Sequence, residues 1–270
     1  MTVFVLDQVP RDAQMNVAIE LMNYSSIYAE QVGFIEKSES YKENKYLRLQ
    51  MMGGEFCGNA TRALAALVVY NEYPYFVKEM DRYIVELEVS GAEDLIRCEV
   101  SETEDDYAYM SKVYMPLPKE IKEFSIIEND TVFSGIKVEF SGITHFIVNR
   151  KEIKNREYFF NLLKSEMDNS DYDAFGIMYY DYDENYLEPL VYVKGTDSLV
   201  EERSCASGTS ALGAALAYTK RCSIEEKIKQ PGGELQVIAD WKENKVIHIC
   251  LDGLVKIVAE GKVNVDNFNV

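Results

Sequence analysis

Two stretches of the sequence share one pattern, and this pattern decides the fold. The first, Cys57–Ala66, reads CGNATRALAA, and the second, Cys205–Ala214, reads CASGTSALGA. When the two are aligned on their cysteines, a threonine, two alanines and a leucine also coincide. Internal similarity of this kind indicates a duplicated structural unit. We therefore expect two similar halves, each carrying a cysteine just ahead of an apolar helix.

The sequence around these stretches alternates short strands with a few helices. Runs of β-branched and aromatic residues predict the strands, and apolar residues at helical spacing predict the helices. In the first half we expect helices at 12–30 and 59–70, and strands at 2–6, 32–36, 46–51, 83–89 and 95–100. In the second half we expect helices at 157–167 and 207–218, and strands at 131–140, 145–148, 175–180, 190–193 and 235–239. The predicted fold class is α+β.

Composition narrows the class of protein. The chain has 270 residues, 47% of them hydrophobic, which is enough to bury a sizeable core. With 28 Lys and Arg against 46 Asp and Glu, the net charge of −18 argues against a nucleic-acid-binding surface, which needs basic patches. The apolar run Val3–Leu6 is too short for a signal peptide, and no stretch approaches the ~20 apolar residues of a membrane span. We expect a cytoplasmic protein with neither a nucleic-acid nor a membrane partner.

Five cysteines are scattered along the chain, at positions 57, 98, 205, 222 and 250. They form no CxxC pair, so the sequence predicts neither a structural zinc site nor a disulfide framework. A single cysteine before an apolar helix is usually a small buried residue, and we expect nothing more of Cys98, Cys222 and Cys250. Cys57 and Cys205 differ from these because they occupy matching positions of the repeat.

The positions of Cys57 and Cys205 indicate a chemical use. A helix N-terminus carries unpaired N–H groups and a partial positive charge, which lower the pKa of a thiol and bind a carboxylate. If both sulfurs face the α-carbon of one amino acid, one thiolate can remove the α-proton while the opposite thiol protonates the other face. The helix N–H groups would stabilise the charge that develops on the carboxylate. This chemistry predicts an amino-acid racemase or epimerase that uses no metal and no cofactor.

The motifs around both cysteines resemble those of a known family. Gly54–Arg62, GEFCGNATR, closely resembles the first cysteine motif of the diaminopimelate epimerase superfamily, and Glu202–Thr209, ERSCASGT, resembles the second. The second motif is also similar to the corresponding segment of proline racemases. Gln230–Gly233, QPGG, resembles the turn that follows the second helix. The resemblance covers nearly the whole chain in order.

The resemblance implies two pseudo-symmetric domains, each a barrel-like mixed β-sheet around one central helix. The first would comprise residues 1–112 together with 258–270, and the second residues 113–257. A final strand near residues 255–265 would return to the first domain. The resemblance also implies a homodimer and a small amino acid as the bound partner.

Individual residues receive roles from the same resemblance. Cys57 and Cys205 would be the acid/base pair that transfers the α-proton. The other positions would surround the substrate: the backbone amides of Gly58, Asn59, Ala206 and Ser207 at the α-carboxylate, Glu202 near the ammonium group, Arg203 next to it, and His145 beside the site. His145 also fits a second interpretation, a histidine buried in the core.

Departures from the diaminopimelate epimerases change the expected substrate. Those enzymes carry Gly-Asn-Pro-His where this chain reads GITH, so Ile143 replaces an asparagine that contacts substrate. Residues 31–36, 55–61, 89–95 and 230–233 instead look like histidine racemases of opine-type metallophore biosynthesis. In that branch, Glu36 would suit an imidazole N–H or a cationic side chain, and its alternative is a solvated carboxylate at a strand end. We expect a histidine racemase; the alternatives are a diaminopimelate epimerase and a non-catalytic amino-acid-binding homologue.

The beginning of the chain also departs from the family pattern. Members usually start with a strand and a Gly-Asn segment ahead of the first helix. Here the chain opens at Met1–Val3, just after the point where that asparagine is expected. We therefore expect a segment upstream of Met1 that contributes an edge strand and a ligand-binding amide.

Overall fold

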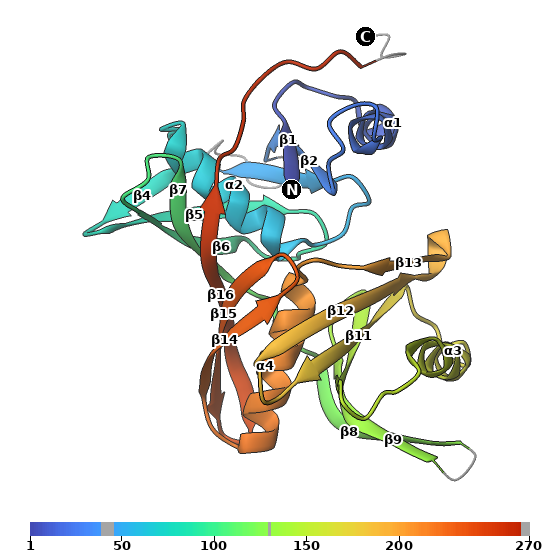
Figure 1. Ribbon diagram of the computed structural model, residues 1–270. Helices are drawn as coiled ribbons and strands as arrows, with labels where there is room; N and C mark the ends of the chain where they lie inside the picture. The colour runs from blue at the N-terminus through green and yellow to red at the C-terminus, as the bar shows by residue number, and fades with distance from the viewer. Residues whose placement is uncertain (39–45, 129–130, 266–270) are drawn as a thin grey trace. The chain divides into compact units, whose positions relative to one another are not determined.

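The computed structural model describes residues 1–38, 46–128 and 131–265. The chain divides into two compact units: unit 1 is Met1–Tyr114 with Asp252–Val270, and unit 2 is Met115–Leu251. The described residues form a mixed α+β fold with four α-helices and a large sheet of parallel and antiparallel strands (Figure 1). None of the described helices is long and apolar enough to cross a membrane. Residues 266–270, part of the predicted first domain, lie outside the described residues.

Unit 1 combines a mixed sheet with two helices, α1 (Arg11–Met22) and α2 (Gly58–Tyr70). The strands follow in the spatial order β1 (Thr2–Val5), β2 (Gln31–Lys37), β3 (Leu47–Met51), β5 (Arg82–Val89), β6 (Ile96–Glu102) and β7 (Ala108–Tyr114), and β4 (Phe76–Glu79) pairs with β5. β1 runs parallel to β2, and β3 runs parallel to β5. The remaining pairs, from β2 with β3 to β6 with β7, are antiparallel.

The alternation of side chains along β2 separates the two faces of this sheet. Val32 and Phe34 are buried in a cluster with Val17 and Leu21 of α1. Because successive side chains of a strand point to opposite faces, Gln31 points away from α1. The Gln31 side chain there meets Cys57, the residue just ahead of α2. Consequently α1 and Cys57 lie on opposite faces of β2.

Unit 2 holds α3 (Arg156–Met167), α4 (Ala206–Lys220) and a short 3-10 turn, Lys194–Thr196. Its strands follow in the order β16 (Lys245–Lys256), β15 (Gly233–Lys242), β14 (Ile224–Gln230), β12 (Tyr186–Val193), β11 (Ala174–Asp181), β10 (Ile143–Asn149), β9 (Thr131–Glu139) and β8 (Glu120–Glu128). β13 (Ser198–Glu201) pairs with β12. β16 belongs to unit 2 as far as Leu251 and to unit 1 from Asp252 onward.

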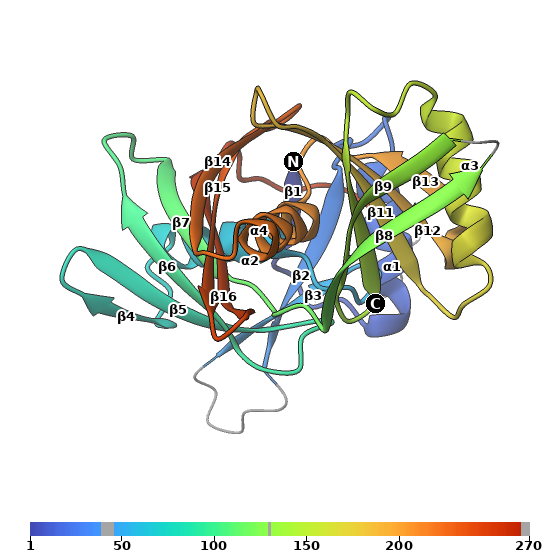
Figure 2. The ribbon, with the colours of Figure 1, turned by 90° about the horizontal axis from the view of Figure 1, so that it is seen from below.

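Helix α4 lies inside the curved sheet of unit 2. Figure 2 shows β14, β15 and β16 on one side of the helix and β8, β9 and β11 on the other. Small side chains allow this close packing: a Cβ placed on Gly213 would lie 2.4 Å from a methyl carbon of Val237. Helix α3 lies outside, where Phe159 and Leu163 pack into an aromatic cluster that includes Phe175. The sheet therefore holds the first turn of α4, and with it Cys205, in a rigid setting.

The predicted elements differ from the structure in three places. The first helix ends at Met22 and not near residue 30, because Asn23 accepts hydrogen bonds from the backbone N–H and the hydroxyl of Ser25 and begins a turn. The final strand is β16, which ends at Lys256, so the strand expected near 255–265 is wrong beyond that residue. Several strands were not predicted, among them β7, β8 and β14. Charged side chains occupy all exposed positions of β14 and most of those of β8, which weakens the hydrophobic signal.

Candidate active site

Cys57 caps the N-terminus of α2 with its sulfur. Its backbone is extended, with φ −126° and ψ 103°, and Sγ accepts the N–H of Ala60 at 3.4 Å. The Thr61 hydroxyl donates to the Cys57 carbonyl oxygen at 2.7 Å. A side-chain acceptor at this position satisfies one of the unpaired N–H groups of the first turn, which is ordinarily the function of Ser, Thr, Asp or Asn. The helix terminus therefore fixes the cysteine sulfur beside its first amides.

Gln31 is a partner of Cys57 that the sequence analysis did not single out. The thiol donates to Gln31 Oε1 at 3.2 Å, and the amide group of Gln31 donates to the Thr2 hydroxyl at 2.6 Å. Residues 31 and 57 are far apart in sequence, and the contact joins the first residue of β2 to the residue just ahead of α2. Gln31 was noted in the sequence only as part of residues 31–36, the stretch that looks like histidine racemases.

Cys205 caps α4 in the same way as Cys57 caps α2. Its φ is −115° and its ψ is 111°, and Sγ accepts the N–H of Gly208 at 3.2 Å. The Thr209 hydroxyl donates to the Cys205 carbonyl oxygen at 2.6 Å. The sulfur-to-amide contact at position i+3 and the threonine contact at position i+4 thus recur in both units, as the shared sequence pattern predicts.

Three polar side chains of unit 2 surround the Cys205 sulfur. The Glu202 carboxyl group lies close enough to the thiol to affect its pKa, and the Ser207 hydroxyl lies 3.5 Å from Sγ. The Ser207 hydroxyl also lies 3.0 Å from Nε2 of His145, a fully buried residue of β10. Burial lowers the pKa of His145 to about 3, so its imidazole is neutral at ordinary pH. The structure therefore brings Cys205, Glu202, Ser207 and His145 together within unit 2.

The protonation of Cys205 differs from the sequence-based expectation. A helix N-terminus is expected to lower a thiol pKa, but burial, together with the neighbouring Glu202, raises the pKa of Cys205 well above its usual value. The amide of Gly208 and the Ser207 hydroxyl act in the opposite direction and do not outweigh this. Burial also raises the pKa of Glu202. Burial therefore outweighs the helix N-terminus at Cys205 and favours the thiol over the thiolate.

Two glycine turns press against the segments that lead into the cysteines. A Cβ on Gly91 would lie 2.4 Å from the Phe56 nitrogen, and a Cβ on Gly232 would lie 2.9 Å from the Arg203 carbonyl oxygen. The Arg203 carbonyl also accepts the N–H of Gly232 at 2.7 Å. Arg203 itself has an exposed side chain. The backbone of Arg203 thus helps to hold the segment that leads into Cys205.

The first turn of α2 places the other predicted residues of unit 1. Gly58 and Asn59 are its first two residues, so their N–H groups belong to the helix terminus beside Cys57. Arg62 donates through Nε to Asn59 Oδ1 at 3.2 Å and through a terminal nitrogen to the Gly253 carbonyl at 3.0 Å. Ala206 and Ser207 begin α4 in the equivalent position. Each cysteine is thus followed by two backbone amides that, according to the resemblance, would bind the α-carboxylate of the substrate.

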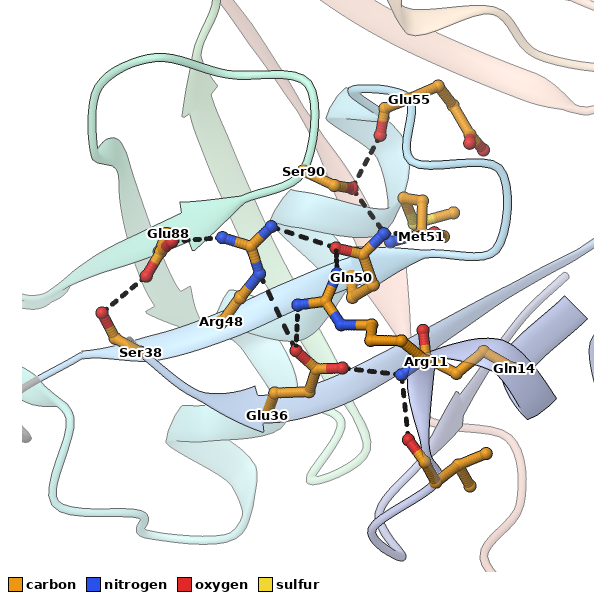
Figure 3. Close-up of polar contacts among 11 residues, drawn as sticks. Arg11, Gln14, Glu36, Ser38, Arg48, Gln50, Met51, Glu55, Glu88 and Ser90 are labelled. Carbon is orange, nitrogen blue, oxygen red and sulfur yellow. Dashed lines mark hydrogen bonds and ion pairs between the residues drawn. The ribbon is translucent and has the colours of Figure 1, made fainter. Parts of the chain in front are cut away.

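Glu36 has a different environment from the one expected (Figure 3). Arg11 and Gln14 of α1 each donate to its carboxylate at 2.6 Å, and Arg48 Nε lies 3.8 Å away. Arg48 is in turn paired with Glu88. The interpretation of Glu36 as a solvated strand-end carboxylate is therefore wrong. Side chains alternate along β2, so Glu36 lies on the same face as Val32 and Phe34, toward α1. The Gln31–Cys57 contact lies on the opposite face.

Comparison with known proteins identifies the family. A model of the N-terminal domain of the histidine racemase CntK matches residues 1–264. The chain belongs to the histidine racemase CntK family. Among CntK-family relatives, a histidine racemase of Fusobacterium nucleatum subsp. nucleatum is 40% identical over 246 residues, which cover 90% of this chain and 85% of the relative. A histidine racemase of Staphylococcus aureus is 25% identical over 98% of this chain and 94% of the relative.

Solved structures support the fold of this CntK-family chain. A hydroxyproline epimerase from Agrobacterium vitis superposes with a TM-score of 0.62 at 10% identity, covering 95% of this chain and 87% of that one. A methylitaconate-delta-isomerase superposes with a TM-score of 0.59, also at 10% identity, covering 95% and 90%. At such low identity the likeness concerns the fold alone.

Proposed function

We propose that this protein is a histidine racemase that uses two cysteines and no cofactor. The observation that carries the proposal is the matched capping of α2 by Cys57 and of α4 by Cys205, with the same extended backbone and the same two hydrogen bonds. The identity of 40% to a histidine racemase supports histidine as the substrate. The proposal includes pseudo-symmetry between the two units, in which both sulfurs face one α-carbon.

The proposed reaction is a proton transfer through the α-carbon. One cysteine, as thiolate, removes the α-proton, and the other, as thiol, delivers a proton to the opposite face. The N–H groups at the starts of α2 and α4 stabilise the negative charge that develops on the substrate carboxylate. Because burial and Glu202 favour the thiol form of Cys205, we assign to it the proton-donating position.

The residues assigned to substrate follow from this geometry. The amides of Gly58 and Asn59, with those of Ala206 and Ser207, would hold the carboxylate, and Glu202 would lie near the ammonium group. His145 supports Ser207 from the core and is neutral, so we assign it a positioning function. Gln31 orients the Cys57 thiol. We leave Glu36 out of the pocket, because Arg11 and Gln14 of α1 bind its carboxylate. Arg203 keeps the place beside Glu202 that the resemblance gives it.

The decisive experiment is α-proton exchange in D₂O over a panel of L-amino acids that includes L-histidine and L,L-diaminopimelate. We expect deuterium incorporation and inversion with histidine. Exchange with diaminopimelate alone would replace the proposed substrate. Cys57→Ser and Cys205→Ser should each abolish inversion, and a protein that binds histidine with no exchange, unaffected by these substitutions, would be a non-catalytic binding homologue.

A further inference from the structure

Gln230 connects the end of β14 to the start of α4. Its side chain is buried, with the residue 5% exposed, and its Oε1 accepts the backbone N–H of Cys205 at 2.9 Å. Its amide group donates to the Thr209 hydroxyl at 2.9 Å. The Thr209 hydroxyl in turn donates to the Cys205 carbonyl oxygen at 2.6 Å. The three hydrogen bonds form a closed ring through the backbone of Cys205.

This ring holds both peptide groups that flank the Cys205 α-carbon. One peptide group supplies the N–H bound by Gln230, and the next supplies the carbonyl bound by Thr209. With both fixed, φ and ψ of Cys205 are set, and they determine the direction of its Cα–Cβ bond. Only the rotation about that bond remains, and the Gly208 N–H, 3.2 Å from Sγ, favours one rotamer.

The turn that follows Gln230 adds a second restraint. Pro231 fixes its own φ and has no N–H to compete for acceptors. The N–H of Gly232 donates to the Arg203 carbonyl at 2.7 Å, two residues ahead of Cys205. The turn therefore holds the segment before the cysteine at Arg203 and at Cys205 itself.

Unit 1 anchors its cysteine segment at a different point. There the Ser90 hydroxyl donates to the Glu55 carbonyl at 2.9 Å and accepts the Met51 N–H at 2.9 Å. Glu55 lies two residues before Cys57, so this contact holds the approach to the cysteine, whereas Gln230 binds the peptide N–H of the cysteine. The hydrogen bonds of Gln230 thus act on the backbone of Cys205.

We propose that Gln230 is a positioning residue for proton transfer at Cys205, a function that rests on the proposed racemase activity. It fixes the cysteine backbone, aims the thiol at the α-carbon and does not touch the substrate. Loss of the ring lets the Cys205 sulfur shift, while the Cys57 sulfur keeps its own support. Removing Gln230 therefore impairs proton transfer on one face of the α-carbon more than on the other.

The test compares Gln230→Met, which keeps the side-chain length and removes both hydrogen bonds, with the wild type. Inversion and α-proton exchange are measured in D₂O from L-histidine and from D-histidine. From the enantiomer whose proton Cys57 removes, we expect more exchange with retained configuration relative to inversion. From the other enantiomer, whose α-proton Cys205 removes, we expect the inversion rate to slow more when the α-hydrogen of the substrate is deuterium. We expect kcat for inversion to fall ~10- to 100-fold, the usual cost of a misplaced reacting group, with KM little changed.

Thr209 supplies the second variant and the matched controls. Thr209→Val opens the same ring and should change the ratio of exchange to inversion in the same way, even if Gln230→Met does not fold. Thr209→Ser keeps the hydroxyl and should give the wild-type ratio of exchange to inversion. Thr219→Val is the control, because Thr219 makes the same i−4 bond, to Ala215, at the far end of α4. Unchanged ratios of exchange to inversion in folded Gln230→Met and Thr209→Val, or the same change of that ratio from both enantiomers, would overturn this inference. Absence of histidine exchange in the wild type would overturn the proposed function instead.

Discussion

Gly91 and Phe56 approach so closely that only a glycine fits at position 91. A Cβ at Gly91 would lie 2.4 Å from the Phe56 nitrogen, and φ of Gly91 is +73°. Phe56 directly precedes Cys57, so the contact sets the path of the chain into α2. Any side chain at position 91 must push that segment and the cysteine that follows it.

Gly91→Ala should therefore reduce both stability and racemisation. The left-handed backbone alone costs on the order of 1 kcal/mol for alanine, and the overlap with Phe56 adds about 1–3 kcal/mol. Gly142→Ala is the matched control, because its φ is +81° but a Cβ there meets nothing within 4 Å. We expect it to lose only the backbone contribution. Urea unfolding and initial rates of both variants check this, and equal losses would show that the Phe56 contact is unimportant.

Glu202→Gln should make the Cys205 thiol more acidic. Burial and the carboxyl group of Glu202 together raise the pKa of Cys205, so replacing the carboxylate by a neutral amide lowers that pKa. The thiolate fraction at a given pH then increases, and alkylation becomes faster. Iodoacetamide labelling of Cys205 against pH, followed by mass spectrometry in a Cys57→Ser background, measures the shift. A labelling profile that moves to higher pH would contradict the assigned effect of Glu202.

His145 should contribute to the loss of stability in acid. Burial lowers its native pKa to about 3, while an unfolded histidine has a pKa near 6.5. Between these values the unfolded state binds a proton that the native state does not, so the free energy of unfolding decreases as the pH falls from about 6.5 toward 3. His145→Gln should flatten this part of the curve. Urea unfolding of the wild type and of His145→Gln across this pH range measures the change in slope.

The sequence was informative where the signal is local. In each half the cysteine, the start of its helix and the duplicated threonine lie within a few residues, so the repeat predicted them together. Gln31 and Gln230 reach the cysteines from 26 and 25 residues away, across strand registers that periodicity cannot supply. The predicted strand after residue 256 failed for a related reason, because no local pattern marks where β16 ends.

The charge environment was the least predictable part of the site. A helix N-terminus implies a lower thiol pKa, but the burial of Cys205 beside Glu202 depends on how β10, β12 and α4 pack. The solvated alternative for Glu36 was inferred from its position at a strand end. Its partners Arg11 and Gln14 come from a helix whose contact with this strand the sequence did not predict. Tertiary contacts, which decide desolvation and pairing, determined both outcomes.

Glu36→Gln distinguishes a structural carboxylate from a substrate contact. Glu36 is 15% exposed and bonded by Arg11 and Gln14, so its loss leaves partly buried donors with a weaker acceptor and should reduce the free energy of unfolding by about 1–3 kcal/mol. Histidine racemisation by the folded variant should stay within about twofold of wild type, since Glu36 lies on the α1 face of β2. Glu120→Gln is the control, because its ion pair with Lys122 is exposed and screened by solvent, so the stability of this variant should stay close to that of the wild type. If the Glu36→Gln protein keeps its stability but no longer binds histidine, Glu36 is a substrate contact and its assignment as a structural carboxylate is wrong.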